Sequence, residues 1–349
     1  MKHSKRQRSL IRARTSSMKR GSKSTAVSCF TSCTTMRVAN ASAQPTGDAK
    51  SWPSRAIHLI VPFPAGSSPD LIARVLSEKL APALGTPVVV ENRPGAGGNL
   101  GTALVARAAP DGYTIGISIP GPLAVNTVLY RKMEYDPFRD LAPVSLVGAS
   151  PNLLVVDPAL KVDSVKEFVA LAQSQPGKLN YGSVGNGSTS HLTMELFKEA
   201  AGIDIVHVPY PGSPQVNTAI LSGQVAAGFV VPATAMPLVQ SGRLKALAVT
   251  TSVRSIVLPE YPTLAEAGYP EVVSTAWNGI VAPAKTPRAI VERLSRELVA
   301  ALRSEDVREK MLRMYFQPTG TAPAGLANLM RSEAERWGRV IRKTGATAD

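Results

Sequence analysis

The hydrophobic and polar residues of this chain follow a pattern that predicts short strands separated by longer amphipathic helices. Residues 57–61 form an apolar run that stops at Pro62, and residues 69–84 carry apolar side chains at helical spacing up to Gly85. The same criteria predict further strands at 87–91, 113–119, 153–156, 178–184, 205–208, 225–231 and 246–250. They predict further helices at 99–108, 165–174, 189–201, 233–239, 288–304, 305–315 and 324–343, with a shorter one ending at Leu221. Regular alternation of strand and helix indicates an α/β fold.

The length of the chain predicts a division into two lobes. A chain of 349 residues exceeds the size of one typical domain. Residues 141–151 and 272–283 are interpreted as crossings between the lobes. We therefore predict a leader or disordered segment at 1–50, a first lobe made of 51–145 and 278–349, and a second lobe made of 146–277.

The net charge of +14 is concentrated near the N-terminus. Residues 1–50 contain 11 Lys and Arg residues and one acidic residue, whereas the remainder contains 28 basic and 24 acidic residues. A nucleic-acid-binding domain carries its basic patch on the folded part, interleaved with aromatic side chains, and only 5% of this chain is aromatic. We therefore expect no nucleic-acid partner. No apolar run approaches the roughly 18 residues that span a bilayer, so we expect the body of the protein to be soluble.

The N-terminal segment, approximately residues 1–43, has features of an export leader, which predicts a periplasmic protein. A basic stretch from Lys2 to Lys23 precedes a Ser- and Thr-rich segment, and Ala41-Ser42-Ala43 forms a small-x-small cleavage site. Because the middle segment is too polar for a strong hydrophobic region, translation from Met18 would give a leader closer to ordinary length. A disordered basic tail on a cytosolic protein is the alternative. Cys29 and Cys33 both lie in this segment, so the mature body would contain no disulfide and no Cys-ligated metal.

The loop between the first strand and the first helix is a candidate anion-binding site. Ser68 is suited to be the N-cap and Pro69 to occupy the first helical position, and Asp70 lies in the first turn. Free backbone N–H groups and the positive end of the helix dipole would then face a ligand without a charged side chain. An ordinary helix start explains the same residues.

A second loop of the same form, Tyr181 to His191, lies between a predicted strand and a predicted helix. Three glycines among small hydroxyl residues allow the backbone to approach a ligand closely. Two such loops in different lobes would face each other across a cleft, and each could hold one end of a dicarboxylate.

Two enzyme interpretations have less support. The glycine loop at 93–101 imitates a dinucleotide-binding motif, but it follows the second strand, and no acidic residue ends a strand about 20 residues later. Close packing of a helix on a sheet explains these glycines. Ser188 and His191 are near each other but lack a G-x-S-x-G elbow, and His58 and His207 lie in or beside strands, where packed histidines are common. No histidine pair or carboxylate cluster has metal-ligand spacing, so we expect no catalytic residue, metal or cofactor.

Several motifs, in the same order along the chain, resemble one family of bacterial receptors. They are IVPFPAG at 60–66, VENRPGAGGN at 90–99, PGKLNYGS at 176–183, HVPY at 207–210, ALAVT at 246–250, PTLAEAG at 262–268 and APAKTP at 282–287. In these motifs the chain resembles the tripartite tricarboxylate transporter substrate-binding proteins, also called Bug receptors. The similarity covers nearly everything after Trp52.

The resemblance implies a type II periplasmic-binding-protein fold, an α/β architecture in which two lobes of mostly parallel sheet, flanked by helices, enclose a ligand cleft. It implies a monomeric, non-catalytic receptor that closes over a small organic carboxylate and delivers it to a membrane permease of the tripartite tricarboxylate type. A carboxylate sensor for a signalling partner is an alternative, and an enzyme using the same cleft is a less favoured one. The implied ligand-binding residues are Phe63, Pro64, Ala65, Gly66, Ser67, Ser68, Asp70, Pro120, Gly121, Ser183, Gly185, Asn186, Gly187, Ser188, Thr189, Val231 and Pro232.

The chain departs from the family pattern in two loops. The family has two consecutive glycines where this chain has Gly66-Ser67, so a hydroxyl enters the loop and either donates a hydrogen bond or narrows the pocket. The loop Ile119 to Leu123 is apolar and rich in proline, which suggests a less polar ligand end than a second carboxylate.

Overall fold

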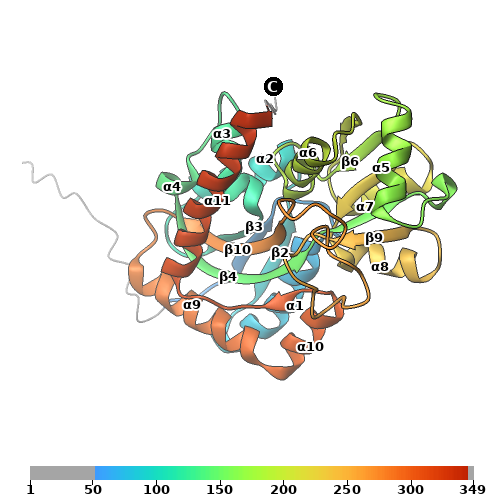
Figure 1. Ribbon diagram of the computed structural model, residues 1–349. Coiled ribbons are helices and arrows are strands. Elements are labelled where there is room, and N and C mark those ends of the chain that lie inside the picture. Colours follow the sequence, from blue (N-terminus) through green and yellow to red (C-terminus); the bar gives the residue numbers. More distant parts are fainter. Residues whose placement is uncertain (1–51, 345–349) are drawn as a thin grey trace, which may run out of the picture. The chain divides into compact units, whose positions relative to one another are not determined.

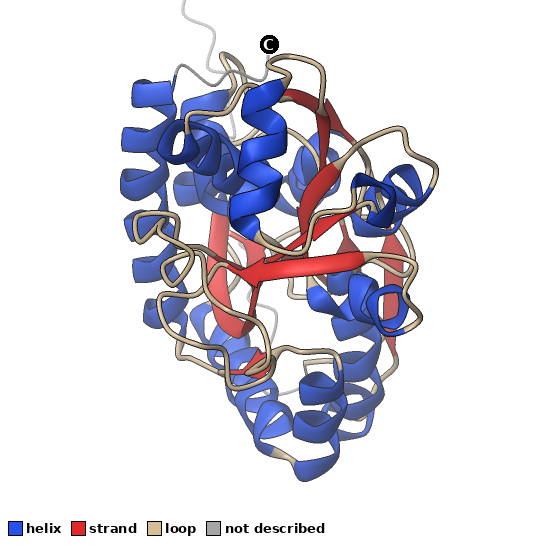
Figure 2. Cartoon of the chain, turned by 45° about the vertical axis from the view of Figure 1, so that its right-hand side comes forward, coloured by secondary structure: helices blue, strands red, loops and turns tan. Residues whose placement is uncertain are grey.

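The computed structural model describes residues 52–344, so the predicted leader and both cysteines lie outside the described residues. Within this part, two sheets are flanked by helices (Figure 1 and Figure 2). The first sheet has the strand order β11-β4-β10-β3-β1-β2, and the second has the order β7-β6-β8-β5-β9.

The bounds of the elements follow the predicted alternation. The first sheet consists of β1 (Ile57–Val61), β2 (Val88–Asn92), β3 (Thr114–Ser118), β4 (Leu141–Pro151), β10 (Thr275–Pro283) and β11 (Gln317–Pro318). Its helices are α1 (Ser68–Leu84), α2 (Asn99–Arg107), α3 (Asn126–Leu129), α4 (Pro137–Asp140), α9 (Arg288–Arg303), α10 (Glu305–Arg313) and α11 (Pro323–Thr344). The second sheet consists of β5 (Leu153–Val156), β6 (Asn180–Ser183), β7 (Val206–Pro209), β8 (Ala227–Val230) and β9 (Lys245–Val249). Its helices are α5 (Val165–Ser174), α6 (Thr189–Ala201), α7 (Ser213–Leu221) and α8 (Pro232–Gln240), and short helical turns lie at Ala96–Gly98, Gly121–Val125 and Pro158–Leu160.

Strand β1 shows why the predicted strands are apolar throughout. Successive side chains of a strand point to opposite faces of the sheet. Leu59 and Val61 belong to a core cluster with residues of α1 and α9, whereas Ile60 belongs to a cluster with residues of α2 and α11. Both faces of this sheet are therefore covered by helices, and the side chains on both faces are buried.

The sheets are mixed, which corrects the prediction that they are mostly parallel. β1 runs parallel to β2 and β3, and β6 runs parallel to β7 and β8. β10 instead runs antiparallel to β3 and β4, and β5 runs antiparallel to β8 and β9. Strand–helix alternation predicts parallel neighbours only where a helix joins two strands. β4 continues into β5 after a single residue, Asn152, and β10 follows residues 250–274, a described segment without a helix, so the alternation does not apply there.

Helices α6 and α11 pack against each other and join the two sheets. Leu192 of α6 lies in the same buried cluster as Trp337 of α11. Farther along these helices, the Lys343 ammonium lies 2.5 Å from a carboxylate oxygen of Glu199. Glu199 lies near the C-terminal end of α6, at the opposite end of this helix from the loop that follows β6.

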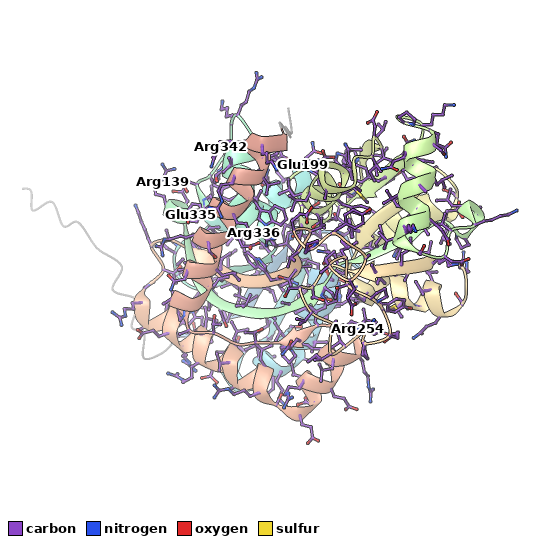
Figure 3. The ribbon with its side chains drawn as sticks, in the orientation of Figure 1. Arg139, Glu199, Arg254, Glu335, Arg336 and Arg342 are labelled. Atoms are coloured by element: carbon purple, nitrogen blue, oxygen red, sulfur yellow. The ribbon has the colours of Figure 1, made fainter. Side chains whose placement is uncertain are left out.

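Charged side chains of the described residues gather on the outside of the ribbon. Figure 3 shows Arg139 and Arg254 projecting from it, and they pair with Asp140 at 2.8 Å and Glu266 at 2.9 Å. Exposed pairs of this kind contribute little to stability. Between residues 52 and 344, no helix combines the length and hydrophobicity required to cross a membrane.

Candidate ligand-binding site

A cavity of about 40 Å³ lies where loops of the two sheets meet. The first sheet contributes segments that follow β1 and β3, together with part of β10, and the second contributes segments at the carboxyl ends of β6, β7 and β8. The carboxyl ends of strands are where open α/β sheets bind ligands. The lining residues are Phe63, Ser67, Ser68, Pro69, Ile119, Pro120, Asn152, Val184, Thr189, Ser190, Gly212, Ser213, Phe229, Val230, Val231, Ala276, Trp277 and Asn278.

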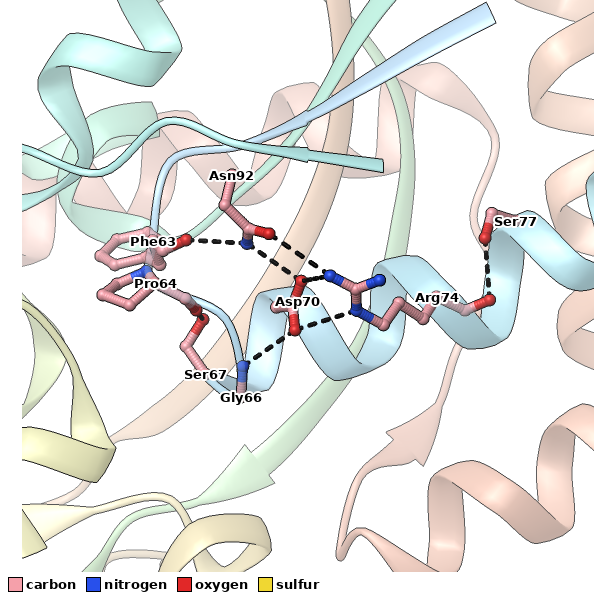
Figure 4. A network of polar contacts seen from close by, with 8 residues as sticks. All are labelled: Phe63, Pro64, Gly66, Ser67, Asp70, Arg74, Ser77 and Asn92. Carbon is pink, nitrogen blue, oxygen red and sulfur yellow. Dashed lines mark hydrogen bonds and ion pairs between the residues drawn. The ribbon is translucent and has the colours of Figure 1, made fainter. Parts of the chain in front are cut away.

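Asp70 organises the loop after β1 from behind the cavity (Figure 4). Its buried carboxylate accepts hydrogen bonds from the Gly66 N–H at 2.9 Å, from Asn92 Nδ2 at 2.9 Å and from the Arg74 guanidinium at 2.9 and 3.1 Å. Asn92 Nδ2 also donates to the Phe63 carbonyl at 3.0 Å. Burial alone would raise the pKa of Asp70, but the hydrogen bonds from Arg74, Gly66 and Asn92 outweigh it and lower the pKa below the ordinary value.

Ser67, rather than the predicted Ser68, is the N-cap of α1. Its backbone is extended, with φ −70° and ψ 158°, and α1 begins at Ser68 with Pro69 next. The Ser67 hydroxyl donates to the Pro64 carbonyl at 2.6 Å, so it closes the loop on itself. The first N–H groups of a helix have no partner within the helix, so the N–H groups of Ser68 and Asp70 face the region in front of α1.

The loop between β6 and α6 is held by hydroxyl groups. Ser188 caps α6 by accepting from the His191 N–H at 3.3 Å and donates to the Gly185 carbonyl at 2.6 Å. Ser190 Oγ accepts from the Val184 N–H at 3.0 Å. These bonds fold the loop into a tight turn and bring Val184, Thr189 and Ser190 to the cavity wall.

The helix N-termini and hydroxyl groups at the cavity suit an anion, although none of its lining residues is charged. The N-terminus of α7 contributes Ser213, and that of α8 begins beside Val231. Thr189 Oγ1 and Asn278 Oδ1 are buried and have no hydrogen-bond partner among residues 52–344. Helix N-termini carry partial positive charge, and buried polar atoms without partners are rare unless a ligand or water satisfies them.

Six of the predicted ligand-binding residues line the cavity: Phe63, Ser67, Ser68, Pro120, Thr189 and Val231. The other predicted residues lie in the same loops but outside its lining: Pro64, Ala65, Gly66, Asp70, Gly121, Ser183, Gly185, Asn186, Gly187, Ser188 and Pro232. The cavity is also lined by four polar or aromatic residues that were not among the predicted ones: Asn152, Ser213, Trp277 and Asn278. One signal was present, because Gly212-Ser213-Pro214 repeats the serine–proline helix start of Ser68-Pro69.

The glycine loop after β2 contacts the loop after β6 instead of lining the cavity. A Cβ atom on Gly97 would lie 3.1 Å from the Asn186 carbonyl oxygen, and one on Gly185 would lie 3.0 Å from the Gly97 Cα. Both residues have positive φ, 61° and 106°. On Gly101, a Cβ would lie 2.6 Å from the Arg93 carbonyl oxygen, which is the close helix packing expected for this loop. These glycines therefore permit backbone contact between segments of the two sheets.

The three histidines among the described residues lie outside the cavity lining. His58 of β1 pairs with Glu91 of the neighbouring strand β2. Burial lowers the pKa of His191 to about 4, with a smaller effect of Lys198, and burial, then His191, lowers the pKa of His207 to about 3. Among the described residues, no group of three His, Cys, Asp or Glu side chains could hold a metal ion.

Comparisons with known proteins match the chain to one receptor family. A family model described as "Tripartite tricarboxylate transporter family receptor" matches residues 72–346. Protein BugT of Bordetella pertussis is 40% identical over 299 residues, which cover 85% of this chain and 92% of that protein.

Two solved structures share both the fold and much of the sequence. An R. palustris protein solved with adipate has a TM-score of 0.82 and 36% identity, covering 85% of this chain and 99% of that one. The periplasmic binding protein BugD has a TM-score of 0.81 and 32% identity, also covering 85% of this chain and 99% of that one. The two-sheet α/β architecture is therefore that of periplasmic receptors. The chain belongs to the tripartite tricarboxylate transporter receptor family, whose members are solute-binding receptors and not enzymes.

Proposed function

We propose that this receptor binds a small organic carboxylate in the cavity between its sheets and delivers it to a membrane permease of the tripartite tricarboxylate type. The observation that carries the proposal is the cavity itself, in which helix N-termini converge and the buried Thr189 hydroxyl, which can donate to a carboxylate, has no partner among the described residues. Adipate in a similar structure supports an organic acid as the ligand class.

The energetics of such a site are compatible with useful affinity. A carboxylate would accept hydrogen bonds from N–H groups at the starts of α1, α6 and α7, and each bond to a charged group contributes roughly 1.5–3 kcal/mol. Three or four such bonds, less the cost of ordering the ligand and the loops, correspond to roughly micromolar binding.

We further propose that the two sheets belong to lobes that move relative to each other. The lobes would comprise residues 51–145 with 278–349 and residues 146–277, connected through β4 and β10. Segments of both sheets line the cavity. Entry of an acid would therefore require the lobes to separate, and closure would follow its entry.

A thermal-shift screen tests the ligand class. The purified protein is mixed with adipate, succinate, benzoate, glutamate and NAD in separate samples. A ligand present at about 100 times its dissociation constant should stabilise the folded protein by roughly 2.7 kcal/mol. Stabilisation by at least one acid is expected, whereas stabilisation by NAD alone would contradict the proposal.

Two cavity variants test the location of the site. Asn278→Asp places a negative charge in a cavity without cations, and we expect binding of an acid to weaken by about 100-fold or more. Thr189→Val removes a buried hydroxyl while keeping the side-chain shape, and about a tenfold loss is expected. Thr127→Val is the matched control, because Thr127 is exposed on α3 and outside the cavity lining. Unchanged affinity in Asn278→Asp would place the ligand elsewhere.

Export and delivery require a cellular measurement. We propose that the chain is exported to the periplasm and that its leader is removed near residue 43. N-terminal sequencing of the mature protein should find a start near Gln44, and a native start at Met1 would contradict export. Uptake of the bound acid should be lost when the receptor gene is deleted and should return with the wild-type receptor but not with Asn278→Asp.

A further inference from the structure

A stack of three rings lies behind the loop that joins β6 to α6. The imidazole of His191, in the first turn of α6, stacks on that of His207 in β7, with ring centroids 4.1 Å apart and 15° between the planes. Tyr181 of β6 also stacks on His207, at 4.9 Å and 24°. None of the three lines the cavity, and the function proposed above does not use them.

The two imidazoles are hydrogen-bonded to both ends of the loop. The Gly187 N–H donates to His191 Nδ1 at 3.2 Å, and Ser183 Oγ lies 2.6 Å from His207 Nε2. Gly187 has a φ of 75°, in the left-handed region that favours glycine, and the hydrogen bond from its N–H helps to hold this conformation. A Cβ on Gly187 would lie 2.1 Å from Asn126 Oδ1, so this turn also abuts the first sheet's segment.

The surroundings favour a neutral His191. The residue is 4% exposed, and the charged groups near the stack are Glu195 and Lys198, which pair with each other at 3.0 Å one turn or more along α6. The Tyr181 hydroxyl donates to Glu195 at 2.7 Å. Burial thus lowers the pKa of His191, and at neutral pH the lone pair on Nδ1 is free to accept from Gly187.

We propose that His191 is a positioning residue of the ligand site: its Nδ1 accepts the Gly187 N–H and thereby sets the loop that carries Val184, Thr189 and Ser190 to the cavity. The bond requires the tautomer with the proton on Nε2. Without it, a buried N–H loses its acceptor, and the turn between Gly185 and Ser188, which Ser188 also holds, loses one of its supporting hydrogen bonds. The role of His191 in the geometry of the loop does not depend on the proposed function. The expected effect on ligand affinity does rest on the proposed function.

Two amide variants of His191 test whether the acceptor must lie at the position of Nδ1 or whether any polar side chain is sufficient. His191→Asn puts an amide oxygen at the place of Nδ1, whereas His191→Gln puts the same group one bond farther out, near the place of Nε2. Amide hydrogen exchange of Gly187 should be about ten times faster in His191→Gln and within about threefold of wild type in His191→Asn. Equal exchange in the two variants, whether slow or fast, would overturn the inference.

The wild-type protein provides a test that needs no variant. In a sample labelled with 15N-histidine, the His191 resonances at neutral pH should show an unprotonated Nδ1 and a protonated Nε2. A proton on Nδ1 would overturn the inference, because both partners of the Gly187 contact would then be donors.

Binding of adipate measures the consequence for the site. His191→Gln should bind adipate about tenfold more weakly than wild type, and His191→Asn should restore binding to within about threefold. Equal affinities of both variants would contradict the effect on the site. If wild-type protein binds no acid of the thermal-shift screen, the proposed function fails, while the exchange and histidine spectra still decide the inference.

Discussion

The loops after β1 and after β6 have the same form but are stabilised by different chemistry. In the first, a buried carboxylate, Asp70, collects the Gly66 N–H, Asn92 and Arg74 behind the helix start. In the second, two imidazoles and several hydroxyls do the same without a charge. In both cases the stabilising group lies behind the loop and leaves helix N–H groups to face the cavity. The comparison indicates that the anion site requires an ordered loop backbone, and that either charged or neutral side chains can stabilise that backbone.

Removing the charge from the first loop should have the largest effect. Asp70→Ala leaves the Gly66 N–H and Asn92 Nδ2 without their acceptor, and we expect the free energy of unfolding to fall by about 3–4 kcal/mol. Urea unfolding measures it. Asp306→Ala is the control, since this exposed carboxylate pairs with Lys79 at the surface, and it should leave the unfolding midpoint unchanged. Equal midpoints for the two variants would show that the Asp70 network does not order the loop.

Acidification should affect the second loop before the first. The pKa of His191 is lowered from 6.5 to about 4, so between these pH values the unfolded chain binds more protons than the folded one. The stability from neutral His191 is fully present above pH 6.5, and roughly 3 kcal/mol of it is lost as the pH falls to 4. The pKa of Asp70 is lowered from 3.8, so its contribution is lost only at lower pH.

Urea unfolding at pH 7, 5.5 and 4.5 measures this difference. The free energy of unfolding of the wild type should decline over this range, and His191→Asn should decline less. The remaining slope in that variant is expected from His207, whose pKa is lowered to about 3. Identical slopes for His191→Asn and wild type would show that His191 is charged or exposed in the folded protein.

Alanine variants of two glycines distinguish the cost of a strained backbone from the loss of a contact between the two loops. The two glycines have similar φ angles but different neighbours. Gly66 has a φ of 78° with nothing within 4 Å of an added Cβ, whereas Gly97 has a φ of 61° with the Asn186 carbonyl 3.1 Å away. Alanine at either position should cost about 1 kcal/mol of stability because of the positive φ. Only Gly97→Ala should also weaken adipate binding, by about tenfold, since its methyl group separates the two loops. Equal affinities, measured by calorimetry, would show that this contact is not needed for binding.

Whether a feature of the fold or the site could be predicted from the sequence depends on how far apart the interacting residues lie along the chain. Leu153–Val156, Val165–Ser174 and Thr189–Ala201 are predicted with their observed bounds, because local periodicity and caps define them. Asp70 is predicted as a ligand contact. In the structure its carboxylate instead accepts a hydrogen bond from Asn92, 22 residues away, and stabilises the loop after β1. Trp277 and Asn278 reach the cavity through the antiparallel pairing of β10 with β3 and β4, which no local pattern encodes.

The smallest effect is expected at Ser67, where the resemblance to the family predicts a second glycine. Ser67→Gly restores the double glycine and removes the hydrogen bond from Ser67 Oγ to the Pro64 carbonyl. Glycine is an acceptable N-cap, so the free energy of unfolding should fall by no more than about 1 kcal/mol. Adipate affinity should stay within about threefold, because the hydroxyl bonds to the loop and not to a ligand. A tenfold loss of affinity with unchanged stability would mean that the Ser67 hydroxyl leaves Pro64 to contact the acid, and the first loop would then use a side chain where the second uses its backbone.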